Sequence, residues 1–166
     1  MEDITPFKII FSRFYKRLEK DEDFFNYYNI SMAEATCLAR DRAKGYLIDV
    51  LDKLTQIGNL QVNFGDYDEE IERINFKLFP NEIRLVVDIM FQEYMEKDIP
   101  RLHAFQINFS PSDINIITPS TERKTYLELL SKLKENNDVA IDNYKNRDRQ
   151  TGMLRKTINY KKYEAY

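Results

Sequence analysis

Apolar side chains recur every three or four residues along four stretches of the chain, which is the spacing of helices with one buried face. The four stretches are residues 5–20, 31–57, 80–97 and 118–146. The second has the clearest boundaries, because Ser31 and Glu34 form a capping-box pattern and Gly58 follows its last apolar residue. The pattern therefore predicts a mainly α protein, a bundle of four main helices.

The apolar faces of these helices are predicted to meet in one core. The second helix carries the longest buried face, made of Ala39, Ala43, Tyr46, Leu47, Val50, Leu51 and Leu54. The shared core is predicted to contain Leu47, Leu51, Leu54, Val87, Met90, Leu130 and Leu133. Gly45 lies inside the second helix, where glycine costs about 1 kcal/mol relative to alanine. Close packing against another backbone would explain its presence.

Threonine followed by proline opens the first and the fourth helix, at Thr5 and Thr118. A threonine hydroxyl can cap free N–H groups, and proline suits the first helical position because that N–H has no partner inside the helix. Residues 98–100, Asp-Ile-Pro, are predicted to end the third helix. The Asn-Asn-Asp run at 136–138 is the point where the fourth helix could break or bend.

Two connections between the helices are long. Residues 60–79 alternate apolar and polar positions around an acidic stretch at 65–70, which predicts short strands or a loop with strand-like arms. Residues 101–117 are predicted to form a long loop that is either packed down or functional.

The apolar pattern stops near Arg147, so we divide the chain into a helical body, residues 1–146, and an extended C-terminal arm, residues 147–166. Residues 142–166 carry seven bases and three acids, a net charge of +4. Since the whole chain has a net charge of −3, residues 1–141 carry −7. A basic, tyrosine-rich arm on an acidic body is typical of an interaction segment.

Residue counts argue against several kinds of catalytic or metal site. Four glycines leave no room for a glycine-rich phosphate loop, and one cysteine and one histidine provide neither a cysteine-based zinc site nor a pair of histidine ligands. Asp66, Asp68 and Glu70 match the opening of a calcium loop, but Ile71 and Lys77 stand where that loop needs glycine and glutamate. We therefore expect no metal, no cofactor and no enzyme activity.

Three further candidates for chemistry have simpler structural interpretations. Asp113 with Glu122 and Lys124 could be drawn as a nuclease-like site, but Glu122 and Lys124 fall in the first turns of a predicted helix and point to different faces. His103 is predicted to lie in a loop without triad partners. Cys37 is predicted to be a small buried residue of the second helix.

Met1 is followed by Glu2 and Asp3, and no uncharged stretch approaches the ~20 residues that span a bilayer. These features predict a soluble intracellular protein that does not contact membranes.

The arm has three interpretations, of which a partner-binding arm and a solvated terminus are equally weighted. In the third, tyrosines stack on bases while lysines and arginines follow a nucleic-acid backbone. We favour an arm that a partner orders, because its apolar volume is too small for the body to order it. The partner-binding residues would be Arg147, Arg149, Leu154, Arg155, Lys156, Ile158, Tyr160, Lys161, Lys162 and Tyr163.

The helices at 31–57 and 80–97, and the helix at 118–144 that runs into the arm, together resemble the head–tail connector, or neck, proteins of tailed bacteriophages. The resemblance implies a structural protein of the virion that forms a ring between portal and tail, present in the host cytoplasm before assembly. Its implied partners are sister subunits, portal and tail proteins, and DNA that passes through the lumen without sequence-specific binding. The alternative is a nucleic-acid-binding or regulatory module that uses the basic tail.

Overall fold

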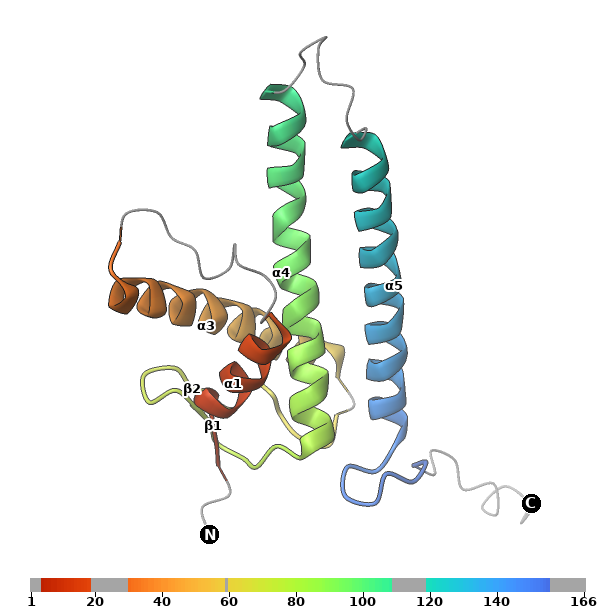
Figure 1. The fold of residues 1–166 in the computed structure, drawn as a ribbon. Coiled ribbons are helices and arrows are strands. Elements are labelled where there is room, and N and C mark those ends of the chain that lie inside the picture. Colours follow the sequence, from red (N-terminus) through yellow and green to blue (C-terminus); the bar gives the residue numbers. More distant parts are fainter. Residues whose placement is uncertain (1–3, 19–29, 59, 109–118, 156–166) are drawn as a thin grey trace, which may run out of the picture.

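The computed structural model describes residues 4–18, 30–58, 60–108 and 119–155, with side chains described up to residue 97 and again from residue 124. These residues form four helices and a small sheet of three strands (Figure 1). The helices are α1 (Phe7–Arg17), α3 (Met32–Ile57), α4 (Pro80–Asn108) and α5 (Pro119–Asn146). The strands are β1 (Thr5–Pro6), β2 (Tyr67–Asp68) and β3 (Arg73–Ile74). The predicted mainly α fold is confirmed.

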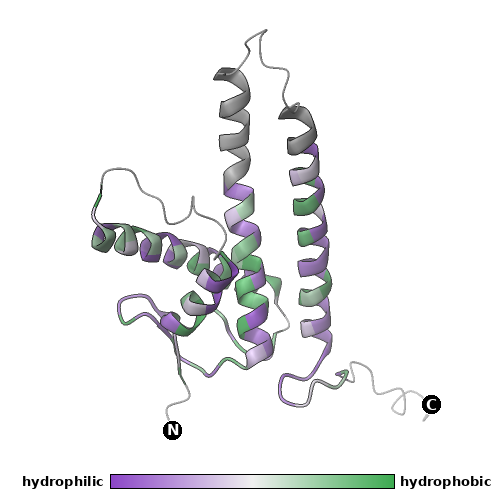
Figure 2. Cartoon of the chain, viewed as in Figure 1, coloured by the Kyte–Doolittle hydropathy of each residue, from purple (hydrophilic) through white to green (hydrophobic). Residues whose placement is uncertain are grey.

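Helix α4 is the centre of the fold. It packs against α1 and α3, while α5 runs antiparallel along it (Figure 1). Hydrophobic residues are concentrated in the middle of α4, and much of α5 is hydrophilic (Figure 2). Six of the seven predicted core residues are buried in one cluster, and Leu133 is partly buried against it. The predicted core is therefore confirmed, with Leu133 at its edge.

Helix α3 follows the sequence pattern closely. Glu34 N–H donates to the Ser31 hydroxyl at 3.3 Å, and Ser31 N–H donates to the Glu34 carboxylate at 2.9 Å, so the predicted capping box is present. Gly58 ends the helix with a φ of 68°, a left-handed conformation that glycine adopts without strain. All seven residues of the predicted apolar face are buried.

Two predictions about individual residues of α3 are wrong. Cys37 is exposed rather than buried, since the first two turns of α3 extend beyond the part that the other described helices cover. Gly45 has no neighbouring atom within 4 Å of the position of a β-carbon, so close packing against a backbone does not explain it.

The prediction that Thr5 caps the first helix is wrong. Thr5 joins the sheet instead. β1 pairs antiparallel with β3, with Thr5 opposite Ile74. The Thr5 hydroxyl donates to the carbonyl of Phe76 at 3.0 Å and accepts from the N–H of Leu78 at 2.8 Å. Pro6 occupies the N-cap position of α1 without a side-chain cap. The hydroxyl therefore satisfies backbone groups 71 and 73 residues away, which outweigh the local capping bond.

Helix α4 continues through Pro100 to Asn108, so the predicted end at residues 98–100 is wrong, and so is the predicted loop over residues 101–108. Residues 109–117 of that loop lie outside the described residues. Proline removes one helical hydrogen bond, but its φ is compatible with the helix, so the chain can continue at a cost of about 3 kcal/mol. His103, which we expected in a loop, lies in this helix.

Helix α5 also runs without interruption past residues 136–138. Asn137 is buried against α4, where its amide donates to the carbonyl of Asp88 at 3.2 Å and to the side chain of Gln92 at 2.8 Å. The asparagine that we regarded as a possible helix breaker thus joins the two helices.

Residues 60–79 contain two short strands, but only partly where we predicted them. β2 lies inside the stretch 65–70 that we predicted as the turn, and residues 60–64, the first predicted arm, form no strand. β2 and β3 pair antiparallel, and β3 lies between β2 and β1. Phe64, Ile74 and Leu78, three of the alternating apolar residues, are buried in the main cluster. The sheet therefore closes one end of the helical core.

Candidate interaction groove

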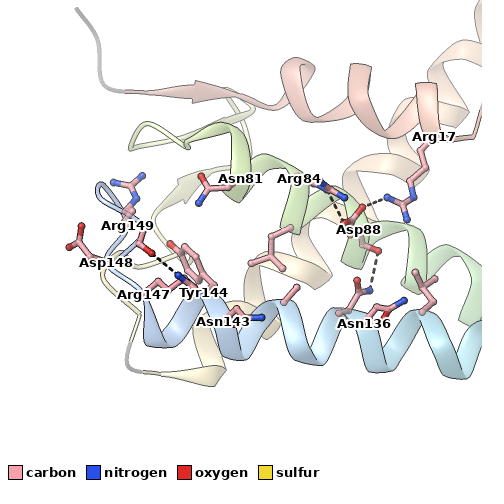
Figure 3. A pocket seen from close by; sticks show the side chains of 15 residues that line it. Arg17, Asn81, Arg84, Asp88, Asn136, Asn143, Tyr144, Arg147, Asp148 and Arg149 are labelled. Atoms are coloured by element: carbon pink, nitrogen blue, oxygen red, sulfur yellow. Dashed lines mark hydrogen bonds and ion pairs between the residues drawn. The ribbon is translucent and has the colours of Figure 1, made fainter. Parts of the chain in front are cut away.

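A groove of about 590 Å³ lies between α4 and α5, and residues 147–152 close one end of it (Figure 3). Leu85, Leu133 and Ala140 form the apolar part of its lining. The amides of Asn81, Asn136 and Asn143 also face the groove, and within the described residues their side chains make no hydrogen bond. The groove therefore combines an apolar floor with polar groups that are free to bind.

Arginines give the groove a positive charge. Arg17 forms an ion pair with Asp88 and lies over the ring of Phe91, with 4.7 Å between the guanidinium carbon and the ring centroid. Arg84 shares the same aspartate at 3.7 Å but is 83% exposed. Arg147 donates to the carbonyl of Gly152 at 3.0 Å and has no carboxylate partner among the described residues. Arg84 and Arg147 are therefore the cations most available to a ligand.

A buried ion pair, Glu82–Arg149, attaches the C-terminal segment to the first turn of α4; we call it the latch. Glu82 is 0% exposed, and its carboxylate accepts two bonds from Arg149, at 2.5 Å from Nε and 3.0 Å from a terminal nitrogen. The Tyr144 hydroxyl and the Phe79 N–H each donate to it at 2.6 Å. A buried carboxylate needs such partners, because its desolvation is otherwise very costly.

Two further features hold the latch in place. The Arg149 guanidinium lies over the ring of Phe79, 4.6 Å from its centroid, and also donates to the carbonyl of Lys77. Burial and the hydrogen bond to Glu82 raise the pKa of Tyr144 well above its usual range, so its hydroxyl keeps its proton and remains a donor.

The segment that follows α5 folds back on the body. Arg147 pairs with Leu154 across a tight turn, in which the Gly152 N–H donates to the carbonyl of Asp148 at 2.8 Å. Arg155 donates through its backbone N–H to the carbonyl of Asn146 at 2.8 Å. The expectation that the body does not order the arm is therefore wrong for residues 147–155. Their ordering comes from hydrogen bonds and the latch, and apolar volume is not required.

The structure separates the ten predicted partner-binding residues. Arg149 is paired with Glu82 inside its own subunit. Arg147 lines the groove, and Leu154 is exposed. Arg155 is partly buried beside the end of α5. Lys156, Ile158, Tyr160, Lys161, Lys162 and Tyr163 lie outside the described residues, and their partner-binding role stays a prediction.

Sequence reasoning missed the latch and the groove. Glu82 was visible in the sequence as an acid in the first turn of a helix, a position that the helix dipole alone would explain. Arg84 and the three free asparagines are single polar residues on amphipathic helices and form no motif. The available signal was the glutamate three residues after Phe79, where a carboxylate can reach back to the N-cap N–H.

The other candidate sites provide no chemistry in the described residues. The Asp68 carboxylate accepts from the N–H groups of Glu70 and Ile71, both at 3.0 Å, so it stabilises the hairpin turn. No group of three or more potential metal ligands occurs in the part of the chain with described side chains. Asp113 and the side chain of Glu122 lie outside the described residues, and Lys124 is exposed at 3.9 Å from Glu128.

We expect Asp148 to titrate with an unusually low pKa. Bonds from the Thr151 N–H at 2.7 Å, from Gln61 and from the Thr151 hydroxyl lower its pKa from 3.8 to about 2. Because the folded pKa is lowered, the stabilisation of the turn is complete above pH ~4 and is lost as the pH falls toward 2. NMR titration of the carboxyl carbon measures this pKa. Thr151→Val should raise it by removing one donor, and a wild-type value near 3.8 would contradict the described turn.

No helix in the described residues is both long and apolar enough to cross a membrane. Comparison of the chain with protein-family models, with curated proteins and with solved structures finds no match.

Proposed function

We propose that this chain is a structural subunit that assembles into a ring, the head–tail connector of a tailed bacteriophage. The observation that carries the proposal is that α5 is covered mainly on the side that faces α4. This helix has 28 residues, and its main packing partner among the described elements is α4. Most of its circumference is therefore available to other subunits.

The side chains of α5 support a contact surface. Leu127, Leu129 and Val139 are exposed, and Leu129 is 54% accessible to solvent. Burying such residues against a neighbouring subunit would contribute about 25 cal/mol for each Å² removed from water. Apolar residues that the body leaves uncovered on a long helix favour an assembling protein.

The latch supports a role for the C-terminal arm in assembly. Because Arg149 is attached to Glu82, the chain beyond Arg155 starts from a defined place beside the end of α5. Residues 156–166 are basic and rich in tyrosine, and the proposed role of this shortened arm is to bind a sister subunit. Portal and tail proteins are the further proposed partners. DNA would pass through the lumen without sequence-specific contacts, because the acidic body repels phosphates.

Removal of residues 156–166 tests the proposal without disturbing the latch. We expect the full chain to form a closed ring, visible by electron microscopy and with a defined mass in light scattering. The truncated chain should have an unchanged circular dichroism spectrum and unfolding midpoint but should remain monomeric. A deletion that begins at residue 148 is unsuitable, because it also removes Arg149 and leaves Glu82 buried without its cation.

Two outcomes would overturn this function. A full chain that stays monomeric up to high concentration would contradict a ring-forming subunit. Unchanged assembly of the truncated chain, with loss of a DNA affinity that falls steeply with salt in the intact protein, would favour the nucleic-acid-binding alternative.

A further inference from the structure

We propose that the groove between α4 and α5 binds the β2–β3 hairpin of a second copy of this chain. This inference rests on the proposed function, because it names a second contact, beside the arm, through which subunits would join. It assigns the contact to two surfaces of the same protein, the groove and the hairpin, and each of them can be changed separately.

The hairpin presents an apolar side chain surrounded by acids. Its turn contains Glu69, Glu70, Ile71 and Glu72, and the Ile71 side chain is 61% exposed. Its own subunit leaves most of this isoleucine in water. It would gain by entering an apolar site on another one.

The hairpin is held rigidly from its inner side. Glu72 forms an ion pair with Arg40 on α3, and its carbonyl accepts from the Phe7 N–H at 2.9 Å. Lys44 pairs with Glu69 at 3.3 Å, and the Asp68 carboxylate fixes the turn. A rigid hairpin loses little conformational entropy when it binds, so its contacts contribute more fully to affinity.

The apolar and hydrogen-bonding groups of the groove complement those of the hairpin. Its apolar floor of Leu85, Leu133 and Ala140 can receive the Ile71 side chain. The free amides of Asn81, Asn136 and Asn143 can each donate and accept, which is what the main chain of a bound turn requires.

Charge complementarity points to the same pairing. The groove lining contains four arginines and two aspartates, and Glu82 behind it neutralises Arg149. Asp88 is shared by two arginines, which leaves a net positive charge near Arg84 and Arg147. In the hairpin turn, the Glu70 carboxylate has no partner among the described residues and is free to meet an arginine.

The hairpin lies on one side of α4, and α5, which forms the groove with α4, lies on the other (Figure 1). A contact between the hairpin of one subunit and the groove of the next is therefore heterologous, since each subunit uses a different surface on each side. Such contacts close into rings when the rotation between neighbours permits it. The pairing thus supplies the head-to-tail arrangement that a ring needs.

Charge reversal on each surface tests the pairing. The groove variant carries Arg84→Glu and Arg147→Glu, and the hairpin variant carries Glu70→Lys. Each variant alone sets like charges against each other, so half-maximal assembly should need at least about ten times more protein. In an equimolar mixture every groove can meet a hairpin of opposite charge, and assembly should return. Sedimentation velocity measures all three samples.

Controls separate this inference from the proposed function. Arg13→Glu with Lys16→Glu on the exposed face of α1 changes the total charge by the same amount as the groove variant and should leave assembly unaltered. Circular dichroism confirms that each variant is folded. If the wild type forms rings and both reversed variants assemble equally well, the hairpin–groove contact is wrong and the ring stands. Failure of the mixture to recover would also overturn the pairing, and a monomeric wild type would overturn both proposals.

Discussion

Replacing Arg149 with alanine is expected to lower the free energy of unfolding by about 3–5 kcal/mol, because the change leaves a buried carboxylate without its cation. Glu82 is 0% exposed and receives two of its bonds from Arg149. The remaining donors, Tyr144 and Phe79, are neutral groups and cannot balance its charge. Urea denaturation followed by circular dichroism measures the loss.

Two further variants make this result specific to the ion pair. Lys134→Ala removes a cation from the exposed surface of α5 and should change the free energy of unfolding by less than about 0.5 kcal/mol. Combining Arg149→Met with Glu82→Gln removes both charges, so this double variant should be more stable than Arg149→Ala alone. A loss below about 1 kcal/mol for Arg149→Ala would mean that Glu82 is not buried in solution.

Replacing Leu51 with alanine is expected to lower the free energy of unfolding by about 2–5 kcal/mol. Leu51 is 0% exposed in the main apolar cluster, so the change loses buried surface and leaves a cavity. Leu38 provides a matched control on the same helix, because it is the same residue type and is 43% exposed.

Leu38→Ala should have little effect, since alanine is the better helix former and little buried surface is lost. Equal losses for the two variants in urea denaturation would contradict the assigned orientation of α3. A loss below about 0.5 kcal/mol at Leu51 would place this face of the helix in solvent.

The parts of the fold that the sequence predicts well are those with local causes. The capping box at Ser31, the glycine stop at Gly58 and the apolar face of α3 depend on neighbouring positions, and all three are present. Thr5 and Pro100 carry equally recognisable local signals, yet both predictions fail. At Thr5 the sheet supplies distant backbone partners, and at Pro100 a long helix tolerates the loss of one hydrogen bond.

The candidate site could not be predicted because its residues are far apart in sequence and individually ordinary. Glu82 and Arg149 are 67 residues apart, and a single chain gives no sign that one acid and one base will meet. The groove depends on the alignment of α4 with α5, which places Asn81 and Asn143 along the same opening. The arm prediction failed at 147–155 for a related reason, since it considered only the apolar volume of the segment.

The position of the latch has a consequence for synthesis on the ribosome. Glu82 emerges 67 residues before Arg149, and at about 5–20 residues per second this interval lasts about 3–13 s. During that time the first turn of α4 cannot bury its carboxylate with a charged partner, so this end of the nascent body stays hydrated. Translation must pass residue 149 before α4 and the C-terminal turn can join. A polypeptide that stops before Arg149 therefore lacks the residues that close this end of the groove.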